Sequence, residues 1–305
     1  MSDVILNNIC KTYNKGIVLA VDDVSFSVGK GELFGLIGPD GAGKTSIFRI
    51  LTTLLLADSG SASVNGYDVV NDYKKIRQHV GYMPGKFSLY QDLTVEENLK
   101  FFATVFNTTI EANYELIKEI YIQIEPFKKR RAGKLSGGMK QKLALCCALI
   151  HRPTVLFLDE PTTGVDTVSR KEFWDMLKRL KQEGITILVS TPYMDEATLC
   201  ERIALMQDGK IMSIDTPKNI TKQYAEILYA IKASNMSHLL SDLRLNKLIR
   251  SCNAFGEYHH ITFNDDLKNS KSELLNYLKS KNYISIEIKQ VAPTIEDCFI
   301  KLMNK

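Results

Sequence analysis

The sequence predicts an α/β protein with a mostly parallel sheet, followed by a smaller α+β domain. The first observation is an alternation of short apolar runs with amphipathic segments of helical length, which continues to about residue 217. Parallel strands joined by helices produce this alternation. The second observation is a change of pattern after Pro217. The third is the length of 305 residues, which favours two domains over one large core.

The first domain begins with two segments, VILNNICKTY and VDDVSFSVGKGEL, that look like strands joined by turns. They predict an antiparallel flank on the main sheet. ELFGLIG then predicts a strand and TSIFRILTTLLL a helix, and TVLFLDE, SRKEFWDMLKRLKQEG and ITILVS repeat the order strand, helix, strand. Between Val80 and Lys134, segments such as TVEENLKFFATVF predict a helical insertion.

Residues 227–305 predict a second domain, with the order βαββαβ and a terminal helix. This is the order of a ferredoxin-like unit. We therefore expect the α/β domain to span residues 1–220, with its helical subdomain at about 85–150. The C-terminal range 227–305 is expected to be an accessory or regulatory domain.

Composition and charge narrow the class of protein. The net charge of +4 is a weak basic bias. Such a bias is more often a solvated exterior than a nucleic-acid surface, so we expect no nucleic-acid partner. No run of 18 or more apolar residues occurs, so the chain itself is not expected to cross a membrane. The six cysteines include no C-x-x-C pair, which indicates the reduced thiols of a cytosolic protein.

The segment GPDGAGKT follows the strand ELFGLI and opens a predicted helix. It fits the phosphate-binding pattern G-x-x-x-x-G-K-[ST], in which glycines let backbone N–H groups curl around phosphate at a helix N-terminus. Lys44 would neutralise the β- and γ-phosphates, and the Thr45 hydroxyl would ligate Mg²⁺. The residues expected to bind the nucleotide here are Gly38, Pro39, Asp40, Gly41, Ala42, Gly43, Lys44, Thr45 and Ser46.

Two carboxylates end the apolar run TVLFLDEP. The carboxyl ends of parallel strands are where α/β sheets bind ligands. Asp159 would hold Mg²⁺ through water, and Glu160 would polarise the water that attacks the nucleotide. The pair therefore predicts hydrolysis, with Glu160 as the catalytic residue.

A third motif, LSGGMKQKLAL, begins at Leu135. Its Ser-Gly-Gly turn at a helix N-terminus is suited to binding an anion. Together with the phosphate-binding loop and LDEP, it resembles the signature sequence of ABC-type ATPases. In that family, ATP lies between the phosphate-binding loop of one ATPase domain and the signature turn of another. The resemblance implies a second ATPase subunit, in a homodimer or a heterodimer, whose nucleotide would be contacted by Leu135, Ser136, Gly137, Gly138 and Asp166.

The resemblance covers essentially the whole chain. Tyr13 matches the aromatic residue that stacks on adenine, TTGVD ending at Asp166 matches the dimer-contact loop, and DLTVEENL matches the start of the helical subdomain. The C-terminal segment APTIEDCFIKLM is similar to the ATPase subunits of drug-resistance and sodium-efflux exporters. The resemblance implies an exporter subunit that uses ATP and Mg²⁺ on the cytoplasmic face of the cell membrane. A separate integral-membrane permease would dock around Lys86 to Leu99.

Three positions differ from the family pattern. Gly85 stands where Gln contacts Mg²⁺ and the attacking water, and Pro192 stands where His contacts the γ-phosphate. Asp40 replaces the usual Asn and adds negative charge near phosphate. Because proline has no donor on its side chain or backbone, the sequence predicts slow hydrolysis at this chain's own loop. The intact Ser-Gly-Gly turn would still complete a site on a partner.

Two alternative functions remain open. A non-transport ABC protein of translation or DNA repair usually joins two ATPase domains or carries long coiled arms, and this sequence shows neither. A regulatory subunit that binds nucleotide but hydrolyses it poorly is favoured by Gly85 and Pro192. Other residues predict no further site: His259 and His260 face opposite sides of a predicted strand, and Trp174 is expected to pack in the core.

Overall fold

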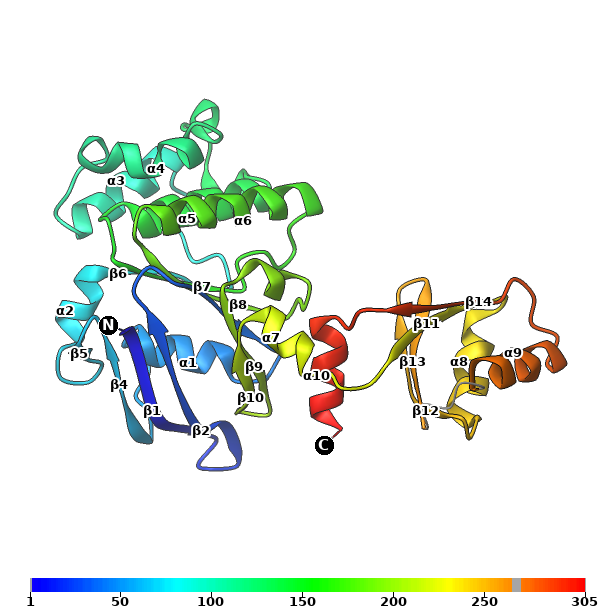
Figure 1. Cartoon of the computed structure of the whole chain (residues 1–305). Helices are drawn as coiled ribbons and strands as arrows, with labels where there is room; N and C mark the ends of the chain where they lie inside the picture. Colours follow the sequence, from blue (N-terminus) through cyan, green and yellow to red (C-terminus); the bar gives the residue numbers. More distant parts are fainter. Residues whose placement is uncertain (1, 265–269, 305) are drawn as a thin grey trace. The chain divides into compact units, whose positions relative to one another are not determined.

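A computed structural model describes residues 2–264 and 270–304 of the protein (Figure 1). The chain forms two compact units, one of residues 1–220 together with 302–305 and the other of residues 221–301. Of the predicted C-terminal range 227–305, residues 265–269 and 305 lie outside the described part. In the ranges that are described, every helix is too short or too polar to cross a lipid bilayer.

A six-stranded sheet forms the centre of the first unit, in the order β10-β9-β3-β8-β7-β6. Pairing is parallel from β9 to β6, and β10 is antiparallel at one edge. Its strands are β3 (Leu33–Ile37), β6 (Val80–Met83), β7 (Val155–Asp159), β8 (Thr186–Thr191), β9 (Arg202–Gln207) and β10 (Lys210–Asp215). Every residue of β3, β7 and β8 is buried, as expected for parallel strands covered on both faces.

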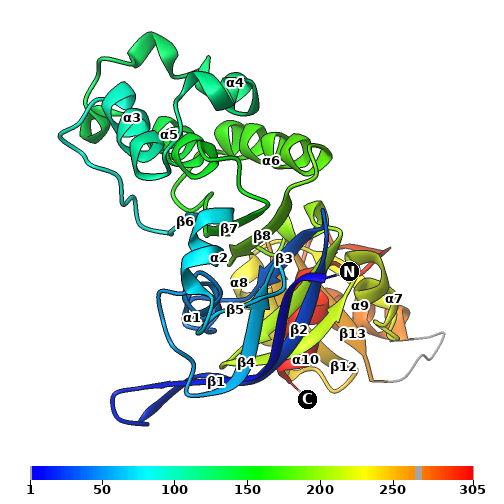
Figure 2. The ribbon, with the colours of Figure 1, turned by 90° about the vertical axis from the view of Figure 1, so that its left-hand side faces the viewer.

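Helices cover the two faces of this sheet. In both views α5 (Gly137–Leu149) and α6 (Thr167–Gln182) lie above the sheet, and α1 (Lys44–Leu51) lies below it (Figures 1 and 2). The strands β3, β7 and β8 run in one direction, so their carboxyl ends meet at one edge. The segments predicted to bind nucleotide follow those ends.

The predicted antiparallel flank is a sheet of its own. It contains β2 (Val18–Gly29), β1 (Ser2–Tyr13), β4 (Ser59–Val64) and β5 (Tyr67–Asp68), in that order. Its inward side chains share one buried core with α1 and the main sheet. Phe26 of β2, for example, stacks on Phe34 of β3 with ring centroids 5.3 Å apart. This packing holds the two sheets together around α1.

The helix after β3 is shorter than predicted, because α1 ends at Leu51 and does not continue through the following apolar run. The Thr52 hydroxyl donates to the Phe48 carbonyl, and Thr53 has a φ of 63°, outside the helical region. The helices and strands without a counterpart in the sequence-based prediction include β4, β5, β9, β10, α2 (Tyr73–His79) and α7 (Pro217–Lys222). Strands such as β4, SGSASV, contain too few apolar residues for an alternation to be seen.

The predicted helical insertion is present. α3 (Val95–Val105) and α4 (Tyr114–Tyr121) both pack on α5. Thr94 and Glu97 form a capping box that fixes the start of α3. Trp174 of α6 is 2% exposed, in agreement with a packing role.

The second unit is a four-stranded antiparallel sheet with helices. Its elements are β11 (Leu228–Lys232), α8 (Met236–Leu245), β12 (Ile249–Phe255), β13 (Tyr258–Phe263), α9 (Ser270–Ser280), β14 (Glu287–Val291) and, as far as Lys301, α10 (Ile295–Met303). Their order along the chain agrees with the prediction, and the strand order is β12-β13-β11-β14. His259 and His260 face opposite sides of β13, since His259 contacts the Met236 carbonyl and His260 contacts Asp297, each at 2.8 Å.

Candidate nucleotide-binding site

The predicted phosphate-binding loop connects the end of β3 to the start of α1, and two of its glycines are required by close packing. A Cβ atom on Gly38 would lie 2.2 Å from the Met206 carbonyl oxygen. A Cβ atom on Gly43 would lie 2.1 Å from the Ala20 carbonyl oxygen, and the φ of Gly43 is +103°. Only glycine fits at both positions, so the loop can wrap tightly around the N-terminus of α1.

The N-terminus of α1 is suited to an anion. Gly43 provides no side-chain cap, and the first turn of α1 carries no acidic residue. Its N–H groups and the helix dipole therefore favour negative charge. The loop, together with Ala20 and Glu160, lines a hollow of about 270 Å³.

Lys44 is held inside this loop. Its side chain is 3% exposed, and Nζ donates to the carbonyls of Gly38 at 2.8 Å and Pro39 at 2.9 Å. Nζ also lies 3.2 Å from Oε1 of Glu160. The predicted phosphate-neutralising cation and the predicted catalytic carboxylate are therefore neighbours.

A serine that the sequence analysis did not identify contacts the Asp159 carboxylate and the backbone of Glu160. The Ser190 hydroxyl, fully buried in β8, donates to Oδ1 of Asp159 at 2.6 Å and accepts from the Glu160 N–H at 3.0 Å. The Ser190 carbonyl also accepts from the Glu160 N–H at 3.1 Å. The hydroxyl residue that ends the apolar run ITILVS was the available sequence signal, but only the β7–β8 pairing shows its partners.

Thr45 and Asp159 are suited to a Mg²⁺ ion that takes most of its ligands from water and phosphate. Among the residues that the structure describes, no group of three or more His, Cys, Asp and Glu side chains is placed to hold a metal. Mg²⁺ commonly takes one or two protein oxygens and completes its shell with water and phosphate. A half-buried hydroxyl and a buried carboxylate meet that requirement.

Gly85 and Pro192 both lie near the carboxyl ends of β7 and β8, around Asp159 and Glu160. We call this region the hydrolytic end of the site. A Cβ atom on Gly85 would lie 3.1 Å from the Asp159 carbonyl oxygen and 3.8 Å from Cβ of Glu160. Pro192 follows Thr191, whose carbonyl accepts from the Gly38 N–H of the phosphate-binding loop at 3.2 Å. The segment after Pro192 forms only the short 3-10 turn η4 (Glu196–Leu199).

Tyr13 and Asp40 lie beside the loop. The Tyr13 hydroxyl is 3.0 Å from Oγ of Ser46, so the end of β1 reaches the N-terminal turn of α1. Asp40 is exposed and lines the hollow. The predicted stacking of Tyr13 on adenine remains a prediction.

The signature segment forms a second cluster, at the N-termini of α5 and α6. The Ser136 hydroxyl caps α5 by accepting from the Met139 N–H at 3.3 Å. The Asp166 carboxylate caps α6, and the hydrogen bond from the Ser169 N–H holds the pKa of Asp166 below its usual value. A Cβ atom on Gly138 would lie 3.0 Å from Oγ of Ser169, so the two helix starts pack closely. Ser136 and Gly137 are exposed, as a contact to another subunit requires.

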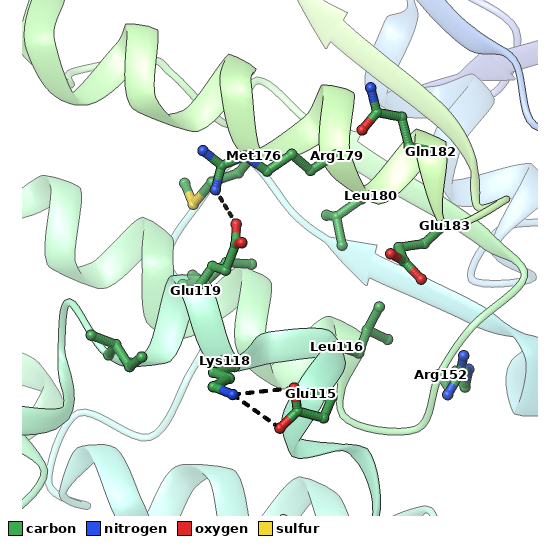
Figure 3. A pocket seen from close by; sticks show the side chains of 12 residues that line it. Glu115, Leu116, Lys118, Glu119, Arg152, Met176, Arg179, Leu180, Gln182 and Glu183 are labelled. Atoms are coloured by element: carbon green, nitrogen blue, oxygen red, sulfur yellow. Dashed lines mark hydrogen bonds and ion pairs between the residues drawn. The ribbon is translucent and has the colours of Figure 1, made fainter.

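Two larger hollows lie away from the loop. One, of about 650 Å³, lies between α4 and α6, and four of its charged side chains form two ion pairs, Arg179 with Glu119 and Lys118 with Glu115 (Figure 3). The other is an apolar groove of about 630 Å³. It is lined by residues of the α1 end, α2, β6, α3 and α5, among them Leu54, Met83, Leu89, Phe102, Val105 and His151.

A loop that cradles phosphate beside a carboxylate placed to activate water defines a P-loop nucleotide hydrolase. Residues 21–163 match the family described as ABC transporter. Over 239 residues the chain is 37% identical to "Doxorubicin resistance ATP-binding protein DrrA" of Mycobacterium tuberculosis H37Rv, covering 77% of this chain and 72% of that protein. The chain belongs to the ABC transporter ATP-binding family.

Other relatives and a solved structure support the same family assignment. The chain is 44% identical over 212 residues to "Probable multidrug ABC transporter ATP-binding protein YbhF" of Escherichia coli K12, but this match covers 69% of the chain and only 37% of that relative. "Linearmycin resistance ATP-binding protein LnrL" of Bacillus subtilis 168 is 29% identical over 98% of this chain and 97% of its own. The dimeric bacterial ABC transporter cassette MJ0796 superposes with a TM-score of 0.64 at 26% identity, covering 70% of this chain and 98% of its own.

Proposed function

We propose that this chain is the ATP-binding subunit of an exporter and couples ATP binding and hydrolysis to transport by a separate membrane permease. The observation that carries the proposal is the convergence of Lys44, Asp159 and Glu160 at the carboxyl ends of β3 and β7, beside a loop that only glycines permit. The names of the relatives, which refer to multidrug, doxorubicin and linearmycin resistance, favour export over the non-transport alternative.

Thr45 and Asp159 would hold Mg²⁺, and Glu160 would orient the attacking water. Bound Mg²⁺ supplies charge neutralisation at the β- and γ-phosphates. Lys44 would supply a second positive charge there, and the α1 N-terminus would donate backbone N–H groups. Tyr13 would cover the adenine ring.

The apolar groove supports a permease partner. Ser88 and Leu89, from the segment predicted to meet the permease, line it together with side chains of the main sheet and of the helical subdomain. An apolar groove shared by two subdomains can accept a short amphipathic helix of a partner. This arrangement would place the chain peripherally, on the cytoplasmic face of the cell membrane.

We also propose that the site on this chain's own loop is degenerate. Pro192 has no donor, and Gly85 has no side chain, while the Ser136 turn is exposed and complete. The chain would then bind ATP mainly to hold a dimer closed, and would complete a competent site on a partner ATPase. Tyr193 is a poor substitute for the missing His, since its ring faces the Arg170 guanidinium at 4.2 Å. A symmetric homodimer is the alternative.

The C-terminal unit is proposed to be a ferredoxin-like accessory domain over residues 227–305, separate from an ATP-binding domain over 1–220. The strand order β12-β13-β11-β14, with two helices between the strands, supports this assignment.

Calorimetry of the purified chain with ATP and Mg²⁺ tests the proposed function. We expect binding without detergent, and its loss in Lys44→Ala, because this substitution removes the buried cation of the loop. Lys142→Ala is a matched control, since Lys142 pairs with Glu172 at the surface of α5 and α6. Unchanged ATP affinity in Lys44→Ala would refute the site, and failure of the chain to copurify with membranes of its host would argue against a permease partner.

A further inference from the structure

A buried carboxylate next to the hydrolytic end has no role in the nucleotide site described above. Glu196 is 2% exposed. Its Oε1 accepts from the Thr162 hydroxyl at 2.8 Å, and its Oε2 accepts from the Thr191 hydroxyl at 2.5 Å. Nε of Arg170 lies 3.5 Å from Oε1. Two hydroxyl donors and a cation hold this buried carboxylate in one geometry, because the loss of a partner is costly for a buried polar group.

The partners of Glu196 come from three separate segments. Thr162 lies two residues after Glu160, in the loop of residues 161–166 that follows β7. Thr191 ends β8, directly before Pro192. Arg170 belongs to α6. Glu196 therefore ties the loop after β7 to the loop after β8, and to the helix that the first loop enters.

The loop after β8 has few other anchors. The Thr191 hydroxyl accepts from the Tyr193 N–H at 3.1 Å while it donates to Glu196. The Tyr193 ring lies under the Arg170 guanidinium at 4.2 Å. Pro192, between them, has neither a side-chain donor nor a backbone N–H. The conformation of this loop is therefore stabilised by the Glu196 carboxylate and its partners, and not by a hydrogen bond from Pro192.

We propose that Glu196 is a positioning residue through which the loop of residues 161–166 sets the conformation of the loop that begins at Thr191. The inference rests on the proposed function, since residues 162–166 of this loop are the ones expected to meet a second ATPase subunit. A displacement of Thr162 on pairing would move the Glu196 carboxylate. That movement would reach Thr191, whose carbonyl is bonded to Gly38 of the phosphate-binding loop.

The test uses the full chain with 3-fluorotyrosine incorporated only at position 193, and reads its fluorine resonance without nucleotide. We expect Thr162→Val to shift this resonance, and the shift to disappear when Glu196→Gln is also present. Two changes that act through one residue are not additive, whereas independent ones are. Thr163→Val, at the exposed neighbouring position, is the matched control and should cause no shift.

The proposal would be overturned if Thr162→Val shifted the fluorine resonance equally in the presence and absence of Glu196→Gln. It would also be overturned if Thr162→Val caused no shift while Glu196 is intact. Thermal melts check that each variant folds. If Glu196→Gln does not fold, Thr191→Val replaces it. It keeps the carboxylate with Thr162 and Arg170 and should reduce the shift, because only the contact through Arg170 to the Tyr193 ring is left. Calorimetry with MgATP on the unmodified chain is a separate measurement: absent binding would refute the proposed function, while the nucleotide-free fluorine comparison still decides the role of Glu196.

Discussion

At the scale of single residues, the hydrolytic end consists of buried polar groups that are hydrogen-bonded or ion-paired with other protein groups. Lys44, Asp159 and Ser190 are each 3% exposed or less. A hydrogen bond to a charged group contributes about 1.5–3 kcal/mol, and a buried group that loses its partner pays its full desolvation penalty. Single substitutions here should therefore have large and specific effects.

Ser190→Ala should weaken the Mg²⁺ site more than the nucleotide site. The substitution removes the donor to Asp159 and an acceptor of the Glu160 N–H, so the free energy of unfolding should fall by about 1–3 kcal/mol. ATP affinity in EDTA should be unchanged, while the gain in affinity on adding Mg²⁺ should shrink. Calorimetry with and without Mg²⁺ checks this, with Ser280→Ala, an exposed hydroxyl deletion, as control. An unchanged Mg²⁺ effect would show that Ser190 does not position Asp159.

Pro192→His should raise the ATPase rate of the chain. A preorganised donor to the developing charge is worth roughly a hundredfold to a thousandfold in rate, so restoring one should give a gain of about tenfold or more. Adding Gly85→Gln should raise the rate further, although its Cβ must first displace the Asp159 carbonyl, 3.1 Å away, by a few tenths of an ångström. Steady-state phosphate release measures both variants.

Pro192→Ala is the control for this comparison, because it removes the ring without adding a donor. The idea of a degenerate site is wrong if the unmodified chain already turns over as fast as the double variant and loses that activity on Glu160→Gln.

At the scale of elements, the helical subdomain meets the main sheet through a stacked pair. His151, after the end of α5, stacks on Phe106 with ring centroids 3.7 Å apart. Its Nε2 lies 3.2 Å from the carbonyl of Val80, the first residue of β6. Burial lowers the pKa of His151 to about 4. The ring is therefore neutral at pH 7, where it can pack in the apolar groove without desolvating a charge.

This pKa shift predicts a pH dependence of stability. The folded pKa lies below the unfolded value of 6.5, so between pH 6.5 and about 4 only the unfolded chain takes up the proton. Stability should be full above pH 6.5, fall as the pH decreases through this window, and lose nothing more from this group below pH 4. His151→Phe keeps a ring against Phe106 and should lose this part of the slope. Denaturant melts across the window, compared between the two proteins, measure it, and identical slopes would contradict the assignment.

At the scale of the whole molecule, the candidate site belongs to one unit. All residues predicted to bind nucleotide, in this chain's own site or in a partner's, lie within residues 1–220. The core of the second unit, with Ile231, Leu239, Leu243 and Leu278 among its buried residues, is a separate cluster. The two units should therefore melt in separate transitions. Nucleotide should raise the melting temperature of the unit that contains residues 1–220 and leave that of the other unit unchanged.

A truncation that ends at Gln223 should fold and bind MgATP with an unchanged Kd. It removes residues 224–301 of the second unit, together with residues 302–305, which group with the first. Calorimetry and a thermal melt with and without MgATP check this expectation. A truncated chain that still melts cooperatively but no longer binds ATP would place part of the site in the C-terminal unit.

The sequence alone determined the features that depend on consecutive residues. The phosphate-binding loop, the Asp159–Glu160 pair and the Ser136 turn are each built from neighbouring residues whose backbone conformation follows from local chemistry. The helix and strand order of the second unit was also predictable, since it rests on local apolar periodicity. The end of α1 was not predicted correctly, because the helix ends at Thr52 and Thr53, inside an apolar run.

Only the tertiary structure decided which distant residues support that site. Ser190 and Glu160 are 30 positions apart, and Thr162 and Glu196 are 34 apart. The first contact exists because β7 and β8 pair in one register. Gly85 likewise meets Asp159 through the packing of the chain after β6 against the end of β7. Strand pairing and side-chain burial are long-range effects of the whole core, so no local pattern encodes them.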